Sequence, residues 1–207
     1  MLKETHEDLV FEFTRDPALL QQYNRLYAAE FRAVQNAEHY HHVEDEHDKR
    51  ADFLIVRQGS FCIGGGRLST KSPCQPHPLP VESNGFKVED YLPHLGQKEI
   101  TYGQAGRICL LPDFRGGDVT TRIIWHINRK AVALGWELMV ATAPLLNARN
   151  NTKLCRRIGL DTKIYFDIPV PPYPMCEGIK MYFMTINVNQ SLVDSRTEPM
   201  KNPRHNF

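Results

Sequence analysis

Residues 111–124 of the chain, LPDFRGGDVTTRII, place a proline and two glycines directly before an apolar run at helical spacing. The apolar positions on one side of this run are Val119, Ile123, Ile124, Ile127, Ala131 and Leu134. Because they recur every three or four residues, they predict an amphipathic helix over 119–134 that ends at Gly135. The stretch therefore predicts a connection into a helix that buries one face.

The turn before this helix combines an acidic residue with features of an anion site. Gly116 and Gly117 permit positive φ angles or close backbone approach, and Arg115 adds a cation. Asp118 stands at the predicted N-cap. Such a turn can aim amide donors and positive charge at one anion, although an ordinary strand-to-helix connection fits the same residues equally well.

The rest of the chain alternates predicted strands and helices. We expect a strand at 10–14, a helix from Asp16 and Pro17 to about Val34, and a hairpin over 51–69 that turns at Gln58 and Gly59. Residues 70–99 carry five prolines and predict an irregular cover. Further elements are predicted as a strand at 104–111, the helix at 119–134, a strand at 137–143, a helix at 147–158 and strands at 162–168 and 179–188. We predict one α/β domain over 1–188 and a flexible tail over 189–207.

Composition narrows the functional classes. The 207 residues are 42% hydrophobic, and 25 Lys and Arg balance 24 Asp and Glu, so no global basic field indicates nucleic acid. Five cysteines, an odd number without close pairing, favour a reducing compartment. No apolar signal core and no run of eighteen apolar residues is present. We expect a cytoplasmic protein without stable membrane insertion.

The ordered motifs resemble the GNAT superfamily of N-acyltransferases. The core of that family has the order found here: a strand, a Pro-x-x-Arg-Gly turn, an amphipathic helix, a second strand and then a segment like NNTKLCRRIGL at 150–160. The phosphate-binding turn of the family has the form Arg-Gly-x-Gly-x-Gly/Ala. That form is kept at Arg115 and Gly116 and broken at Asp118 and Thr120. The resemblance implies a mixed twisted sheet with helices on both faces and a cleft between the strands at 104–111 and 137–143.

A closer resemblance over residues 10–188 is to the acyl-homoserine-lactone synthases and the N-acyl amino acid synthases. Those proteins carry an Asp-x-x-Asp pair before a hairpin, an Arg-Leu at its end and a Glu-x-x-Arg on the next strand. The matching positions are Asp45, Asp48, Arg67, Leu68, Gln104 and Arg107. The resemblance implies that Asp45, Asp48, Arg67, Gln104 and Arg107 form the catalytic and acceptor side of the site.

Departures from the lactone synthases bear on the acceptor. Those synthases carry Arg-x-x-x-Phe in the first helix and a Trp six residues later, whereas this chain has Tyr27, Phe31 and Ala37. Gln104 also replaces the family glutamate. Because these family residues serve the S-adenosylmethionine donor of the amine, their absence favours an amino acid or another small amine as acceptor.

Asp118 bears on the acyl donor. A carboxylate at a helix N-terminus repels the pyrophosphate of coenzyme A, whereas a carrier-protein phosphopantetheine brings one phosphodiester. The sequence therefore favours an acidic acyl carrier protein, which would meet Arg115, Arg122, Arg129, Lys130, Arg149, Lys153, Arg156 and Arg157. Ordinary solvated helix faces would carry the same residues.

The resemblance also assigns roles at the thioester. Strand amides at Leu110 and Leu111 would hold the carbonyl, and the turn would bind the pantetheine phosphate through Arg115, Gly116, Gly117, Asp118, Val119 and Thr120. Cys155 stands where the family has a tyrosine that protonates the thiolate, although a buried structural cysteine is the simpler interpretation. Gln104 cannot take a proton, so the base stays open between Glu137, Asp45, Asp48 and a water chain.

Several residues have a plain structural interpretation beside the functional one. The histidines at 39, 41, 42 and 47 lack a recognisable ligand spacing and predict a surface cluster rather than a metal site. Gly64, Gly65 and Gly66 mark either a bulged strand or room for an acyl chain or close backbone approach. Arginines at strand ends, such as Arg67 and Arg107, are more often structural ion-pair partners than catalytic residues, and Asp45 or Asp48 would fit such a pair.

The sequence thus favours an enzyme that moves a long fatty acyl group from acyl carrier protein to an amino acid or another small amine. An acyl-phosphopantetheine thioester, on carrier protein or coenzyme A, would be the cosubstrate, without a metal, a tightly bound cofactor or nucleic acid. The alternatives are a lactone synthase, an acetyl-coenzyme A-dependent N-acetyltransferase and a non-catalytic module that binds an acyl carrier.

Overall fold

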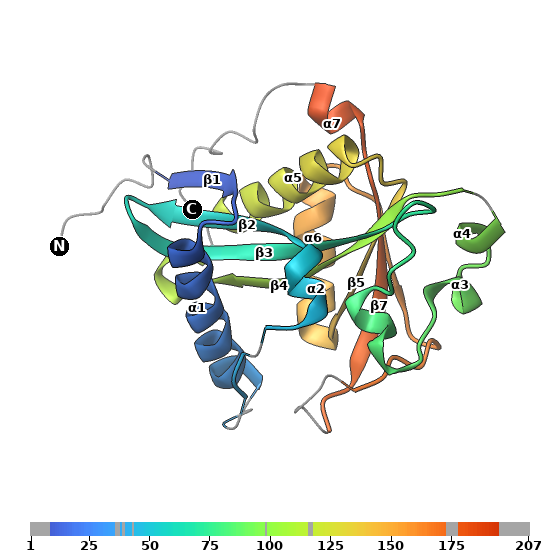
Figure 1. The fold of residues 1–207 in the computed structure, drawn as a ribbon, viewed down its shortest axis with the longest axis horizontal. Helices are drawn as coiled ribbons and strands as arrows, with labels where there is room; N and C mark the ends of the chain where they lie inside the picture. Colours follow the sequence, from blue (N-terminus) through green and yellow to red (C-terminus); the bar gives the residue numbers. More distant parts are fainter. Residues whose placement is uncertain are drawn as a thin grey trace, which may run out of the picture.

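A computed structural model describes residues 9–35, 38, 40–42, 44–97, 99–115, 118–172 and 178–194. Seven strands form one sheet in the order β1-β2-β3-β4-β5-β7-β6. Only β4 and β5 pair in parallel, and the other neighbours are antiparallel. The mixed α/β sheet with helices on both faces confirms the predicted fold class (Figure 1).

The strands are β1 (Leu9–Phe13), β2 (Asp52–Gln58), β3 (Phe61–Lys71), β4 (Tyr102–Leu110), β5 (Leu138–Pro144), β6 (Thr162–Tyr165) and β7 (Met181–Asn187). The α-helices are α1 (Pro17–Gln35), α2 (Glu46–Arg50), α3 (Val88–Tyr91), α4 (His94–Gln97), α5 (Asp118–Ala133), α6 (Leu145–Arg157) and α7 (Ser191–Asp194), with 3-10 turns η2 (Pro80–Asn84) and η3 (Pro112–Phe114). None of the helices in the described part of the chain has the length and apolar character needed to cross a bilayer.

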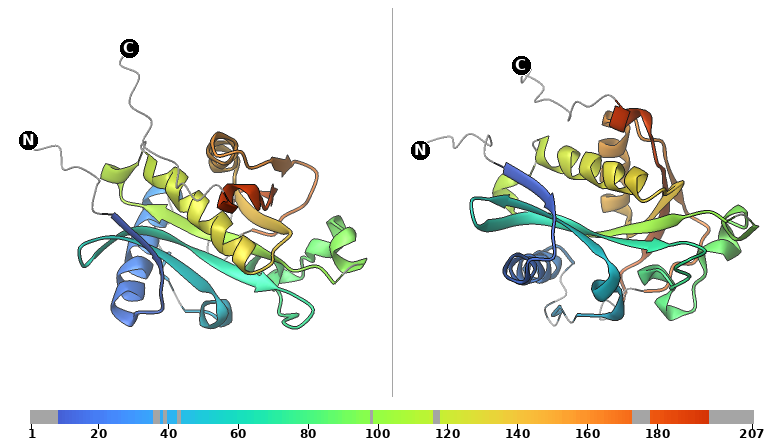
Figure 2. Two further views of the ribbon diagram at one scale, coloured as in Figure 1. Left: turned by 90° about the horizontal axis from the view of Figure 1, so that it is seen from above. Right: turned by 45° about the horizontal axis from the view of Figure 1, so that its top comes forward.

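Helices α1 and α5 lie on opposite faces of β2–β4 (Figure 2). Tyr23 and Tyr27 of α1 pack against Phe53 and Ile55 of β2. On the other face, the apolar stripe predicted from the opening stretch packs against the alternate residues of the same strands. Because strand side chains alternate between faces, one hairpin supports both helices.

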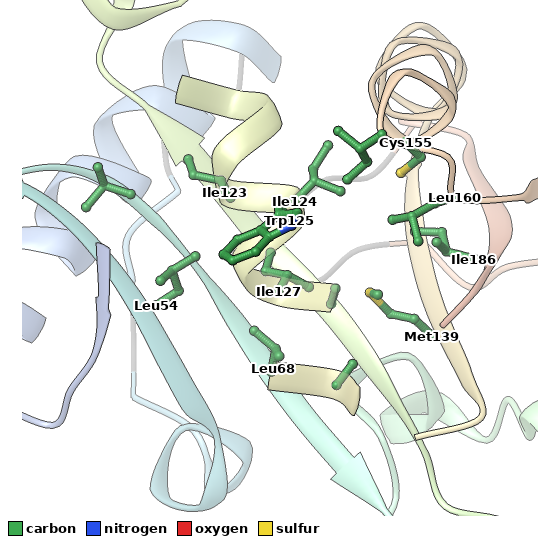
Figure 3. Close-up of a cluster of buried hydrophobic side chains, with 14 of the residues drawn as sticks. Leu54, Leu68, Ile123, Ile124, Trp125, Ile127, Met139, Cys155, Leu160 and Ile186 are labelled. Atoms are coloured by element: carbon green, nitrogen blue, oxygen red, sulfur yellow. The ribbon is translucent and has the colours of Figure 1, made fainter. Parts of the chain in front are cut away.

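The α5 face forms the largest cluster of buried apolar side chains (Figure 3). Ile123 and Ile127 are fully enclosed between α5 and the sheet, and Cys155 and Leu160 join them from α6 and the turn after it. Met139 and Ile186 extend the cluster onto β5 and β7. This core therefore fixes α5 and α6 relative to β4 and β5 of the sheet.

The proline-rich segment packs as a cover on a separate cluster. Leu79, Val88 and Leu95 form one buried apolar cluster with Tyr102, Val140 and Phe183 of the sheet. The predicted irregular segment contains the short elements η2, α3 and α4, which its prolines did not predict. Leu192 of α7 packs against the α5 cluster, within the segment predicted as a loose tail.

Candidate active site

Strands β4 and β5 separate after a short parallel contact. Their pairing is confined to Tyr102–Gln104 with Leu138–Val140. Beyond it, β4 continues along β3 to Leu110, while β5 continues along β7 to Pro144. We call the region between the two strand ends the β4/β5 divergence (Figure 1). The predicted separation of these strands is confirmed.

The backbone of Leu110 faces this divergence. Leu111 N–H donates to the Ile63 carbonyl at 2.9 Å, so Leu111 is paired with β3. In an antiparallel ladder the next residue directs its N–H and C=O to the opposite edge, and Arg115 Nε indeed reaches the Leu110 carbonyl at 2.9 Å. Of the two amides predicted to hold a thioester carbonyl, the Leu111 amide is therefore occupied by the sheet, and the Leu110 amide is directed to the divergence.

A bulge in β4 places Arg107. The register of β3 and β4 shifts between Gly65 and Arg67, and Arg107 has φ 52°, the left-handed region that a non-glycine residue seldom adopts. Tyr23 Oη donates to the Arg107 carbonyl at 2.6 Å from α1 and helps to hold this conformation. Backbone outliers of this kind gather at functional sites because the surrounding structure must stabilise them.

Four charged side chains meet beside this bulge, and we call them the ion-pair cluster: Asp45, Asp48, Arg67 and Arg107. Asp48 Oδ1 accepts from Arg67 at 2.6 Å and from Arg107 at 2.8 Å. Asp45 contacts Arg67 at 3.3 Å and Arg107 at 3.1 Å. The structure therefore brings together four of the five predicted catalytic residues from α2, β3 and β4.

The first turn of α2 is stabilised by a capping box, in which Asp45 and Asp48 each accept a hydrogen bond from the backbone N–H of the other. Asp45 accepts from Asp48 N–H at 2.8 Å, and the Asp48 carboxylate accepts from Asp45 N–H at 3.1 Å. Burial alone would raise the pKa of Asp48, but the Arg107 and Arg67 guanidiniums and the hydrogen bond from Arg67 lower it below its ordinary value. Asp48 is therefore an ionised anchor for both arginines.

His42 lies against the same cluster. Its Nε2 is 3.6 Å from Asp48 Oδ2, and its side chain is 9% exposed. Among the described residues, neither ring nitrogen has a hydrogen-bond partner. The sequence predicted a surface cluster of histidines, which is wrong for His42. His39 lies outside the described residues, and His47 contacts Ser83 Oγ at 2.8 Å.

The side chain of Gln104 is hydrogen-bonded to the cover segment and not to the ion-pair cluster. Its buried side chain accepts from Val81 N–H at 2.9 Å and so ties the cover segment to β4. The side-chain oxygen of Gln104, at the position of the family glutamate, is therefore used to hold the cover segment. We accordingly assign it no proton transfer.

The turn before α5 differs in part from its prediction. Asp118 is the first residue of α5 and is exposed, one position later than an N-cap, and Gly116 and Gly117 lie outside the described residues. Arg115 forms a salt bridge with Glu30 besides its bond to Leu110. Val119 is buried in the core, while Thr120 is half-buried. A carboxylate at the first helical position still places negative charge beside the N-terminal amides.

Cys155 is enclosed in the α5 core (Figure 3). It is 1% exposed, and burial raises the pKa of its thiol to about 12. Because its thiol is surrounded by apolar side chains of this cluster, Cys155 is left out of the proposed chemistry. This placement agrees with the structural interpretation of the cysteine.

The three glycines of β3 permit close packing. A side chain at Gly65 would lie 2.2 Å from the Leu54 carbonyl, and one at Gly64 would lie 2.6 Å from the Cys109 carbonyl. Gly66 is less restricted, because a side chain there would lie 3.3 Å from Ile108. Close backbone approach therefore applies to Gly64 and Gly65, and the predicted bulge is also present, because the register with β2 skips Ile63 beside Gly64.

No protein-family profile and no curated protein sequence matches the chain. Solved structures do. FeeM, an N-acyl amino acid synthase from uncultured soil microbes, has a TM-score of 0.61 at 9% identity, covering 90% of this chain and 93% of FeeM. The AHL synthase LasI has a TM-score of 0.60 at 14% identity, covering 95% of this chain and 98% of LasI.

A third solved structure is that of BjaI, a CoA-dependent acyl-homoserine lactone synthase with SAM and isopentyl-CoA. Its TM-score is 0.60 at 15% identity, covering 86% of this chain and 80% of BjaI. These likenesses show that the chain shares the fold of these three proteins, as the sequence motifs predicted.

Proposed function

We propose that the chain is an N-acyltransferase that moves a fatty acyl group from a phosphopantetheine thioester to the amine of an amino acid or another small amine. The observation that carries this proposal is the β4/β5 divergence, with the Leu110 amide directed into it and Arg107 of the ion-pair cluster three residues away on the same strand. FeeM and LasI, which share the fold, are an N-acyl amino acid synthase and an AHL synthase.

The proposed reaction uses the strand backbone to polarise the thioester. The pantetheine arm would lie in the β4/β5 divergence with the carbonyl oxygen at Leu110 N–H, which would stabilise the negative charge of the tetrahedral intermediate. Arg107, with its guanidinium held by Asp45 and Asp48, would border the acceptor. Because the Leu110 amide and the Arg107 side chain are held in place, they would lower the entropic cost of orienting the thioester and the amine for reaction.

An acyl carrier protein is the donor that the surface charges favour. Four exposed basic side chains of α6 recur at spacings of four, three and one residues: Arg149, Lys153, Arg156 and Arg157. Such a row suits an acidic protein surface. The basic residues of α5 are partly engaged, since Lys130 forms a salt bridge with Asp52 at 3.1 Å and Arg129 lies 5.6 Å from the centre of the Trp125 ring.

The test of the proposed function is product analysis of lipid extracts from a host that expresses the chain, followed by assays with purified acyl carrier protein and acyl-coenzyme A thioesters. New N-acyl amino acids support the proposal. Lactones would identify a synthase of the LasI type, and acetylated amines made only from acetyl-coenzyme A would identify a small-acyl transferase. Absence of acyl transfer with every donor would contradict the proposal and favour a carrier-binding module.

Replacing Asp118 with glycine is expected to change donor choice. Removal of one negative charge from the first turn of α5 should improve coenzyme A binding by about 1 kcal/mol, or roughly fivefold, because charges at a helix N-terminus are typically worth this much. Binding of acyl carrier protein should change little. Calorimetry at one low ionic strength would measure both, since salt screens the effect. Equal coenzyme A affinity for both proteins would contradict the role assigned to Asp118.

A further inference from the structure

The acyl transfer proposed above requires a base, and the residues considered from the sequence do not provide one. Asp45 and Asp48 are both engaged by arginines. Glu137 precedes β5, at the end where β4 and β5 still pair, so it lies away from the divergence. Gln104 has no basic group. A base must therefore come from a residue that the motifs did not single out.

We propose that His42 is the general base that accepts the proton of the attacking amine in this reaction. Its imidazole is nine-tenths buried beside the ion-pair cluster, yet neither ring nitrogen has a hydrogen-bond partner among the described residues. Buried polar atoms are nearly always satisfied, so two unsatisfied ring nitrogens indicate a partner that arrives with the substrate. An amine is such a partner.

The cluster gives the imidazole an orientation. Nε2 faces Asp48 Oδ2 at 3.6 Å, which is too long for a hydrogen bond but close enough for attraction, and contacts of catalytic bases are often looser without substrate. Asp48 thereby favours the tautomer with the proton on Nε2 and leaves the Nδ1 lone pair for the amine. Asp48 is itself fixed by Arg67 and Arg107, so it acts as a positioning residue.

The charges around His42 keep it neutral near pH 7. Burial lowers the pKa of the imidazole below its ordinary 6.5, and Arg107 and Arg67 lower it further, while Asp48 and Asp45 oppose them. These four groups come from α2 and its cap, β3 and β4. A neutral imidazole is the form that accepts a proton.

The step balances as a simple acyl transfer. The amine lone pair forms an N–C bond to the thioester carbonyl carbon, and the proton leaving nitrogen goes to Nδ1. The C–S bond then breaks with its electron pair on sulfur, and the thiolate takes a proton from solvent as the imidazolium returns its own. For its proton to reach Nδ1, the acceptor would have to bind between Arg107 and Leu110, which are about 10 Å apart along the strand, and displace the groups that cover the ring nitrogens.

The test compares His42→Gln with His41→Gln, an exposed neighbour, using the full chain and the donor and amine found active in the product analysis. His42→Gln should lose about 100-fold in kcat with little change in KM, because a general base contributes at least this much. Wild-type kcat/KM, whose pH profile reports the free enzyme, should fall as pH drops below the ordinary imidazole pKa of 6.5, and His42→Gln should lack this acid limb. His41→Gln should match wild type in both.

A second measurement keeps the inference testable if His42→Gln melts at a lower temperature. NMR titration of the wild-type imidazole should give a pKa equal to that of the acid limb. A folded His42→Gln that retains kcat within about threefold, or a titration that does not match the limb, would overturn the base assignment alone. An inactive wild type would overturn the proposed function and this inference with it.

Discussion

Replacing Asp48 with asparagine is expected to destabilise the protein by about 3 kcal/mol, because removal of one partner of a buried ion pair leaves the others uncompensated. Asp48, Arg67 and Arg107 have side chains that are 5%, 5% and 6% exposed. Asparagine preserves the shape and an oxygen for Asp45 N–H, so the change tests the charge. The remaining contacts of Asp45 with both arginines place the loss at the low end of the usual range. Urea unfolding at pH 7 would measure it.

Asp45→Asn is the matched control. The Asp45 side chain is 39% exposed, and asparagine is an equally good N-cap, so we expect a loss of about 1 kcal/mol or less. Equal losses in the free energy of unfolding for the two variants would show that burial of the carboxylate does not determine how strongly it stabilises the protein. This ranking also separates Asp48, which holds both arginines in the core, from Asp45 at its edge.

The pH dependence of the Asp48 effect has a definite sign. The pKa of Asp48 is lower in the folded protein than its ordinary 3.8, so its ionised form stabilises the fold at pH values above 3.8. That stabilisation is lost as pH falls through the lowered folded value. The difference between wild type and Asp48→Asn should therefore be constant near neutrality and shrink in acid. A difference that grows below pH 3.8 would contradict the assigned ionisation.

The sequence predicted those elements that have a clear hydrophobic period. Helix α5 was predicted because its apolar residues recur at helical spacing and meet the core at the same positions. The five residues of α2 are all polar or charged, so no period marks them, and the turn is held by its capping box and by the arginines that bind Asp48. Helices α3 and α4 were likewise hidden because the prolines of the surrounding segment 70–99 favour irregular structure when tertiary contacts are unknown.

Parts of the site were predictable for a different reason. Opposite charges in motif order led to the expected pairing of Asp45 and Asp48 with Arg67 and Arg107. His42 carried no such signal, since it is one of several histidines in a charged stretch and its burial depends on the packing of three elements. The occupation of the Leu111 amide depended on the register of β3 and β4, which only the folded sheet defines.

The Leu110 amide offers the sharpest test of the proposed chemistry. Leu110→Pro removes an N–H directed to the β4/β5 divergence, and proline is compatible with the strand here because this N–H is not part of the β3 ladder. Loss of one oxyanion donor is expected to lower kcat by about 100- to 1,000-fold. The measurement is single-turnover acyl transfer with saturating thioester, so that weaker binding does not mimic slower chemistry.

Leu110→Ala separates the amide from the packing. Leu110 is 5% exposed, so both variants lose a buried side chain, at about 2–5 kcal/mol, but only the proline variant loses the donor. Both would be assayed at a temperature where circular dichroism shows them folded, with rates given per folded molecule. The alanine variant should keep most of its kcat because its N–H still faces the divergence. Equal kcat in the two variants would show that the thioester carbonyl is polarised elsewhere, and the role of the divergence as the acyl site would then lose its chemical basis.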